Sequence, residues 1–254
     1  MCNRSIGFIH ALSEISGIPE DELFINWRGL NHLTFVDGVF NRGRNILPEL
    51  LAKLEDGHMY DLSVPADLLR RLGFLPNQYL QYYYTRRHKV EWLRAQEKVR
   101  SEAVKEIDEA LLEQYKGIDA IPEELKKRGG YRYSETVVNI IAGICGNLGS
   151  QHFAVVRNGS TLPELPEDAF VEVPVIAHGE GLLPLQTGPL PRAARSLVIA
   201  MKDYDRAGIE GAMNRDRKAL FEALMIHPLI ADYDVAAPLL DDCMALNAEY
   251  MPRF

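Results

Sequence analysis

The stretch LFINWRGLNHLTFV, residues 23–36, carries the pattern on which the fold prediction depends. Residues 23–27 are rich in bulky β-forming side chains and are predicted to form a strand. Residues 29–32, with the sequence GLNH, then lie at or just past the end of that strand. Residues 33–36 predict a returning strand, with turn residues at Asp37 and Gly38.

The rest of the chain mixes strands with helices, and the helices cluster late. Apolar side chains recur every three positions over residues 6–15, which predicts a helix ending before Gly17. Ser134 is expected to cap a helix. Further helices are predicted at 46–54, 66–72, 90–115, 192–204, 210–226 and 235–250, and strands at 152–156 and 170–175. This pattern favours an α+β fold. No linker demands a second domain, so we expect a single domain over residues 1–254.

Composition limits the classes of partner and compartment. The net charge of -8 argues against nucleic acid, because a phosphate backbone requires a basic face. Three cysteines, Cys2, Cys145 and Cys243, make an odd set without paired spacing, which favours a reducing compartment. No apolar run approaches the length of a membrane span, and the start of the chain has no signal pattern. We therefore expect a cytoplasmic protein with neither membrane nor nucleic-acid partners.

A dinucleotide-binding unit is not found in the sequence. Such a unit needs a strand, a G-x-G-x-x-G turn and a helix. The scattered glycines of residues 143–149 (GICGNLG) lie inside or after a predicted helix, so they mark a helix end and not a phosphate-binding turn.

Cys2 and His32 are candidate metal ligands. Thiolate and imidazole bind metals of the manganese-to-zinc class, and two protein ligands leave positions open for substrate and water. Each residue also has a plainer interpretation, because a terminal cysteine is often incidental and a lone histidine usually lies on the surface.

The tyrosines at positions 79, 82, 83 and 84 are candidates either for packing or for acid–base chemistry. On a helix, Tyr79, Tyr82 and Tyr83 would share a face and could simply pack. A phenol becomes a general base when a nearby cation lowers its pKa from about 10, and a bound divalent metal is such a cation. We predict that Tyr79 has this role and that its neighbours pack.

Arg100 is a candidate for phosphate binding, because the planar guanidinium pairs with phosphate oxygens. The alternative is a surface arginine on a charge-rich helix. Arg86, Arg87 and His88 are second candidates for the same role.

Three motifs in fixed order carry a family resemblance: Cys2-Asn3, then GLNH at 29–32, then YLQYY from Tyr79. They resemble the C-terminal half of glycoside hydrolase family four. Segments 121–130, 165–168, 171–174 (VEVP) and 246–250 are similar to its 6-phospho-β-glucosidase branch, so the resemblance covers essentially the whole chain. The chain departs from the family at residues 157–160, where a loop is one residue short, and at Arg4-Ser5, which replaces Val-Pro.

The resemblance implies a role for each candidate. Cys2 and His32 would bind a divalent metal, which the family implies to be Mn²⁺. Asn3 and Asn31 would contact sugar hydroxyls, and Tyr79 would be the catalytic base. Arg100 would lie near the 6-phosphate of the sugar, although its local match is shifted by one residue.

The chemistry implied is hydrolysis of O-glycosyl bonds, with 6-phospho-β-glucosides as the expected substrates. Family four is an exception to the two-carboxylate scheme, and this sequence offers no compelling acid pair. NAD would oxidise the sugar at C3, Tyr79 would remove the acidified C2 proton, and the C1–O bond would break by elimination before water adds. The alternatives are α-glycosides or unphosphorylated sugars as substrates, or a noncatalytic sugar-phosphate-binding or oligomerisation module.

The same resemblance implies that NAD is bound mainly by an N-terminal Rossmann domain that this chain lacks. The chain would then be inactive, or nearly so, by itself. It would be a fragment, one product of a split gene, or a noncatalytic remnant. Apolar faces on the late helices lead us to expect a homodimer or tetramer.

Overall fold

The computed structural model describes residues 4–55, 64–117, 121–128 and 133–250 of the chain. Its centre is a seven-stranded antiparallel sheet with the order β3-β2-β1-β6-β5, to which β4 adds at β2 and β7 at β6. The strands are β1 (Leu23–Leu30), β2 (Leu33–Asn41), β3 (Arg44–Asn45), β4 (Leu75–Pro76), β5 (Ser150–Arg157), β6 (Phe170–His178) and β7 (Gly181–Pro184).

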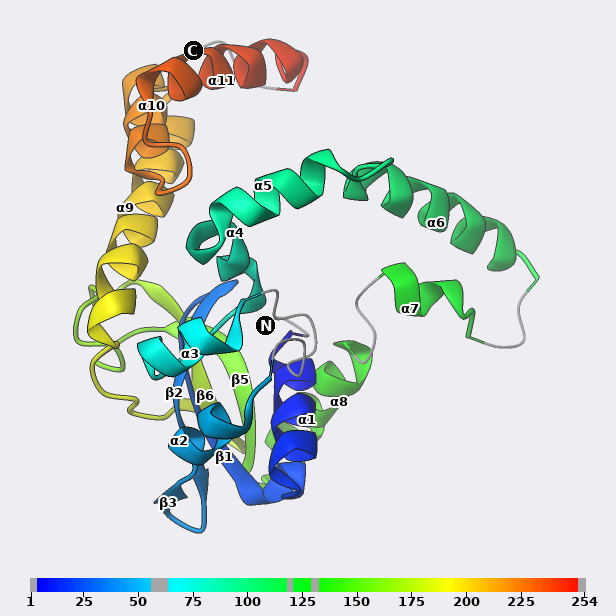
Figure 1. The fold of residues 1–254 in the computed structure, drawn as a ribbon, viewed down its shortest axis with the longest axis vertical. Helices are drawn as coiled ribbons and strands as arrows, with labels where there is room; N and C mark the ends of the chain where they lie inside the picture. The colour runs from blue at the N-terminus through cyan, green and yellow to red at the C-terminus, as the bar shows by residue number, and fades with distance from the viewer. Residues whose placement is uncertain (1–3, 56–63, 118–120, 129–132, 251–254) are drawn as a thin grey trace.

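Helices pack on the sheet and extend beyond it (Figure 1). They are α1 (Arg4–Ser16), α2 (Leu47–Lys53), α3 (Ala66–Leu72), α4 (Gln81–Tyr84), α5 (Arg86–Arg94), α6 (Arg100–Gln114), α7 (Glu124–Arg128), α8 (Tyr133–Cys145), α9 (Arg192–Asn214), α10 (Arg217–Ile226) and α11 (Tyr233–Leu246), with the short 3-10 helices η1 (Glu20–Glu22) and η2 (Gln78–Leu80). Helices together with an antiparallel sheet confirm the predicted α+β class. Within the described residues, no helix is both long and apolar enough to cross a membrane.

The two faces of the sheet support separate hydrophobic cores. Helices α1, α2 and α3 cover one face, where Leu12 and Leu69 pack with the strand residue Trp27. Helix α9 covers the other face, where Val198 packs with Val173 of β6. Strand residues alternate between the faces, so β1, β2 and β5 contribute to both cores, while β6 contributes to the core under α9.

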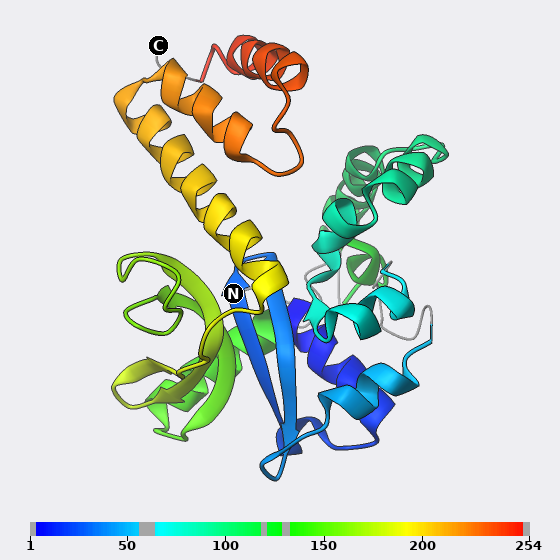
Figure 2. The ribbon, with the colours of Figure 1, turned by 60° about the vertical axis from the view of Figure 1, so that its left-hand side comes forward.

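Two helical arms project from the same end of the sheet (Figures 1 and 2). One arm consists of α4, α5 and α6, and the other of α9, α10 and α11. Both arms expose large apolar side chains, among them Trp92, Leu112, Ile209 and Leu246. The predicted apolar faces of the late helices are therefore present.

The predicted turn at Asp37-Gly38 is wrong, because β2 continues through it to Asn41. Ile25 pairs with Val39 but Trp27 pairs with Val36, so β2 holds one extra residue here, which is a β-bulge. Gly38 suits the bulge, since a Cβ there would lie 2.5 Å from the Phe40 ring. The chain turns instead at Arg42-Gly43, where both residues have positive φ.

Three helix predictions also differ from the structure. The helix expected at 90–115 is two helices, and the N–H of Val99 donates to Glu102 where the second begins. The break expected after residue 204 is absent, because α9 runs on until Arg215 adopts φ 58°. Ser134 lies inside α8 and does not precede it. The glycines of 143–149 do follow the predicted pattern, because α8 ends among them at Cys145.

Candidate active site

The tip of the β1–β2 hairpin presents Asn31 and His32 as a two-residue turn between Leu30 and Leu33. His32 has φ 64°, a left-handed conformation that histidine and asparagine adopt more readily than most residues. Gly29 makes the turn possible, since a Cβ at its φ of 144° would collide with the carbonyl oxygen of Leu33. Both turn side chains are exposed.

Strand pairing brings Tyr79 to the same place. Phe35 of β2 pairs antiparallel with Pro76 of β4. His32 lies three residues before Phe35 and Tyr79 three residues after Pro76, so both lie at the same end of this strand pair. The ring centroids of His32 and Tyr79 lie 4.7 Å apart. The structure therefore brings together the predicted metal-ligating histidine and the predicted base.

The backbone of Tyr79 is fixed by hydrogen bonds to the hairpin. Buried Asn77 donates its backbone N–H to the Thr34 carbonyl at 2.8 Å and its side-chain N–H to Thr34 Oγ1 at 3.1 Å. Asn77 Oδ1 in turn accepts from the Tyr79 N–H at 3.1 Å. Tyr79 thus sits on a 3-10 turn anchored to β2 and not on the longer helix that the tyrosine spacing suggested.

A buried carboxylate lies behind the turn. Glu172 of β6, 1% exposed, pairs with Gly29 across the sheet. Its Oε1 accepts from the Trp27 indole at 3.0 Å and its Oε2 accepts from Asn31 Nδ2 at 2.7 Å. No role was predicted for Glu172 from the sequence. The available signal was a glutamate within the valine-rich strand VEVP, which is an unusual residue for a buried position.

Helix α1 packs beside this carboxylate, since Phe8 meets the Trp27 ring edge-on with centroids 5.3 Å apart. Cys2 and Asn3 precede α1 and lie outside the described residues. Of the predicted metal ligands, the structure therefore describes His32 alone. Among the described residues, no three His, Cys, Asp or Glu side chains gather as a metal-binding group.

The structure places Arg100 away from these contacts. Its guanidinium donates to the carbonyl oxygens of Lys127 at 2.9 Å and Arg128 at 3.4 Å, which ties α6 to α7. No hydrogen bond from Arg100 to Asn31 or His32 is found in the described part of the chain. Its predicted phosphate role stays a prediction.

The other tyrosines contact one another and Lys89, and Tyr83 keeps 42% of its surface exposed, so their packing role stays a prediction. Tyr83 and Tyr84 meet edge-on at 5.2 Å, and Lys89 lies over the Tyr82 ring at 5.6 Å. Burial of the Tyr84 phenol, together with neighbouring Tyr83, raises its pKa to about 12. Tyr84 is thus kept protonated and is unsuited to act as a base near neutral pH.

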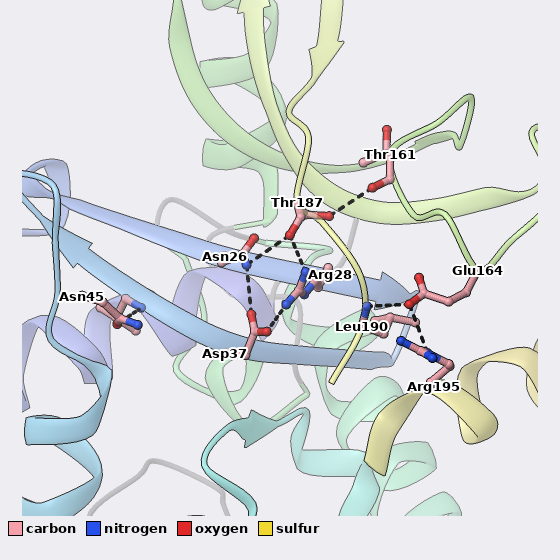
Figure 3. Close-up of polar contacts among 10 residues, drawn as sticks. Asn26, Arg28, Asp37, Asn45, Thr161, Glu164, Thr187, Leu190 and Arg195 are labelled. Atoms are coloured by element: carbon pink, nitrogen blue, oxygen red, sulfur yellow. Dashed lines mark hydrogen bonds and ion pairs between the residues drawn. The ribbon is translucent and has the colours of Figure 1, made fainter. Parts of the chain in front are cut away.

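A polar network on β1 and β2 anchors the strands that carry the turn (Figure 3). Buried Arg28 pairs with Asp37 and donates to the Thr187 carbonyl oxygen. Asn26 also donates to Asp37, at 2.9 Å. Desolvation lowers the pKa of Arg28. The network joins the hairpin to the segment that leads into α9.

Glu164, in the loop before β6, contacts the start of α9 (Figure 3). It accepts a hydrogen bond from the backbone N–H of Leu190 at 2.9 Å and forms an ion pair with Arg195 at 3.2 Å. These bonds join the loop before β6 to the first turns of α9. The helix that covers one core is therefore fixed at its N-terminal end.

These features define an α+β domain with an imidazole and a phenol paired at a hairpin tip. Residues 27–230 match the family model described as the Family 4 glycosyl hydrolase C-terminal domain. The chain belongs to the family 4 glycosyl hydrolases.

Its relatives include phosphoglucosidases. The chain is 30% identical over 253 residues to the 6-phospho-beta-glucosidase BglT of Thermotoga maritima, covering 99% of this chain and 61% of that protein. It is 28% identical over 266 residues to a probable 6-phospho-beta-glucosidase of Bacillus subtilis, covering 100% and 60%.

Solved structures agree in fold. The Thermotoga maritima 6-phospho-beta glucosidase, determined with manganese, NAD+ and glucose-6-phosphate, superposes with a TM-score of 0.90 at 30% identity, covering 100% of this chain and 61% of that one. A 6-phospho-alpha-glucosidase from gut microorganisms with NAD and Mn²⁺ gives 0.86 at 18% identity, covering 100% and 62%, which supports the fold alone. This chain spans about three fifths of the length of these relatives.

Proposed function

We propose that this chain supplies the metal-binding and proton-transferring part of a 6-phospho-β-glucosidase that uses NAD and a divalent metal. The observation that carries the proposal is the contact between His32 of the β1–β2 turn and Tyr79 of η2, whose ring centroids lie 4.7 Å apart. The 30% identical Thermotoga maritima relative, with manganese, NAD+ and glucose-6-phosphate in its structure, supports the same reading.

Among the described residues, we expect His32 to bind a metal at the turn. Imidazole is a suitable ligand for manganese-class cations, and the left-handed turn presents His32 at an exposed tip. Cys2 and His32 would hold the cation. When bound, the cation supplies Lewis-acid stabilisation of sugar oxygens, and NAD supplies reversible oxidation at C3.

The side chains of this chain then have distinct tasks. The Tyr79 phenolate oxygen would accept the proton from C2 of the sugar, after which the C1–O bond breaks and the leaving group departs. Asn3 and Asn31 would hydrogen-bond the sugar hydroxyls. Arg100 would bind the 6-phosphate, which requires its guanidinium to serve a ligand in addition to the α7 carbonyls.

The wider setting forms part of the proposal. Residues 1–254 would act as one substrate- and metal-binding domain, with NAD bound mainly by residues outside this chain. We place the protein in the cytoplasm and propose a homodimer or tetramer in which the exposed apolar side chains of the helical arms are covered.

Reconstitution tests the function. The chain is fused to the C-terminus of the N-terminal part of the Thermotoga maritima relative, which is the part that this chain does not match. We term this fusion protein the two-part enzyme. With NAD, Mn²⁺ and reductant, the two-part enzyme should release p-nitrophenol from p-nitrophenyl 6-phospho-β-glucoside. Omission of NAD or of Mn²⁺ should abolish this release. The proposal is contradicted if well-folded two-part enzyme cleaves none of the 6-phosphoglycosides or free glycosides. A sugar-phosphate-binding module would instead bind glucose 6-phosphate without cleaving any glycoside.

A further inference from the structure

Glu172 is a buried acidic side chain whose two oxygens serve only neutral donors. It is 1% exposed and accepts from Trp27 Nε1 at 3.0 Å and from Asn31 Nδ2 at 2.7 Å. Within the described chain, Glu172 forms no ion pair with a lysine, arginine or histidine. Burying a carboxyl group is costly unless its hydrogen bonds are satisfied, so its placement next to an exposed turn calls for a physical reason.

The contact fixes which way the Asn31 amide faces. A carboxylate oxygen only accepts hydrogen bonds, so the Asn31 NH₂ group must face Glu172 and its carbonyl Oδ1 must face away. Asn31 as a residue is exposed, so a ligand can approach its side chain from solvent. Without Glu172, the two ends of the amide would exchange places at little cost.

The other end of the contact is rigid. The Trp27 indole that donates to Glu172 is 2% exposed and packs between Phe8 at 5.3 Å and Phe153 at 5.5 Å. Glu172 is also held by the pairing of its strand with Gly29 of β1. The carboxylate is therefore a fixed reference point, connected on one side to the core and on the other to the turn.

We infer that Glu172 is a positioning residue that orients Asn31, so that Oδ1 accepts a hydrogen bond from a sugar hydroxyl beside His32. The inference rests on the proposed function for the role of that hydroxyl contact. The orientation of Asn31 itself is a property of this chain alone. Glu172 does not touch the sugar and acts only through Asn31.

The first test is nuclear magnetic resonance of the chain alone, with the side-chain amide signals of Asn31 assigned by their loss in Asn31→Ala. In the wild type, these protons should exchange with solvent more slowly than those of exposed Asn214, whose side chain has no hydrogen bond among the described residues. In the isosteric Glu172→Gln, the new amide places a donor opposite Asn31 Nδ2, and the Asn31 signals should shift. Glu167→Gln, at an exposed position in the loop before β6, is the control and should leave the Asn31 signals in place.

The second test is a double-mutant cycle in the two-part enzyme. Loss of a residue that orients a ligand-binding side chain costs about 10–100-fold in activity. We expect Glu172→Gln to lower kcat/KM by the same factor. In the Asn31→Ala background the same substitution should have no further effect, because Glu172 then has nothing to orient. A merely structural role would give the same loss in both backgrounds.

The outcomes separate this inference from the proposed function. Asn31 protons that exchange as fast as those of Asn214 in the wild type overturn it, whether or not the variant folds. Unchanged Asn31 signals in folded Glu172→Gln, or additive losses in the cycle, overturn it as well. If the wild-type two-part enzyme cleaves nothing, the proposed function fails, and the resonance measurement still decides whether Glu172 orients Asn31.

Discussion

The imidazole of His32 and the phenol of Tyr79 lie with ring centroids 4.7 Å apart and planes tilted by 36°. The contact follows from the pairing of β4 with β2 at Phe35 and Pro76 and from Asn77, which bonds to both Thr34 and the Tyr79 N–H. A metal held by His32 would therefore lie close to Tyr79 and would stabilise a phenolate there. One local arrangement thus serves both the proposed ligand and the proposed base.

His32→Asn should weaken Mn²⁺ binding without unfolding the chain. Asparagine tolerates the left-handed conformation at φ 64°, so the turn is retained while the imidazole ligand is lost. Loss of a residue that only holds a metal ligand in place costs about 10–100-fold in affinity. Because His32 would be a ligand itself, we expect the Kd for Mn²⁺ to rise by more than that. Electron paramagnetic resonance of Mn²⁺ titrated into the chain measures this. The control is His10→Asn, on the exposed face of α1, which should leave binding unchanged; equal binding by both variants would rule out His32 as a ligand.

Asp37→Asn should strongly destabilise the fold. It removes the charge that neutralises Arg28, whose side chain is 5% exposed, and breaking a buried pair costs about 3–5 kcal/mol. Because the Asp37 side chain is 22% exposed, we expect the lower part of that range. Urea denaturation measures the loss. Asp67→Asn, which breaks the exposed pair with Arg71, should leave the midpoint unchanged.

Gly29→Ala and Gly7→Ala should change stability in opposite directions. A Cβ at Gly29 would meet the Leu33 carbonyl, and its φ of 144° is a strained conformation for alanine, so a loss of at least about 1–3 kcal/mol is expected. A Cβ at Gly7, inside α1, meets nothing within 4 Å, so the higher helix propensity of alanine should add about 0.5–1 kcal/mol. Thermal unfolding of both variants checks the signs, and a harmless Gly29→Ala would contradict the described turn.

Tyr84→Phe should remove part of the stability loss at high pH. The folded-state pKa of Tyr84 is raised from 10.0 to about 12, so the stability of the wild type is fully present below pH 10 and falls as the pH rises toward 12, because only the unfolded chain ionises readily there. Its hydroxyl is buried without a hydrogen-bond partner among the described residues, so phenylalanine should cost nothing at neutral pH. Denaturation of both proteins across this range measures the difference. Tyr250→Phe, at an 81% exposed position, should retain the wild-type pH dependence.

The sequence predicted the local parts of the fold better than its long-range parts. Residues 23–27 were predicted as a strand and lie in β1, because bulky β-forming side chains are a local signal. Gly38 suggested a turn but forms a bulge, since Asp37 is held by Arg28 from the neighbouring strand. A break was expected between residues 204 and 210, but α9 continues through it, and Gly211 further along α9 admits Leu220 of α10. Both errors depend on partners that are distant along the chain.

The candidate site was predicted from order and resemblance rather than from geometry. His32, Asn31 and Tyr79 do converge at one hairpin tip. Glu172 was missed because its link to Asn31 depends on the pairing of β6 with β1, which no local pattern reveals. The roles of Cys2 and Asn3, which lie outside the described residues, stay predictions.

The most direct measurement is the isotope content of the product formed by the two-part enzyme in heavy water. If Tyr79 removes the C2 proton, wild-type enzyme should release a sugar phosphate carrying deuterium at C2. Tyr79→Phe should lose both cleavage and exchange by about 10²–10⁴-fold, while Tyr83→Phe, which alters a packed tyrosine on α4, should retain both. Product free of deuterium at C2, or full activity in Tyr79→Phe, would contradict proton transfer by this tyrosine.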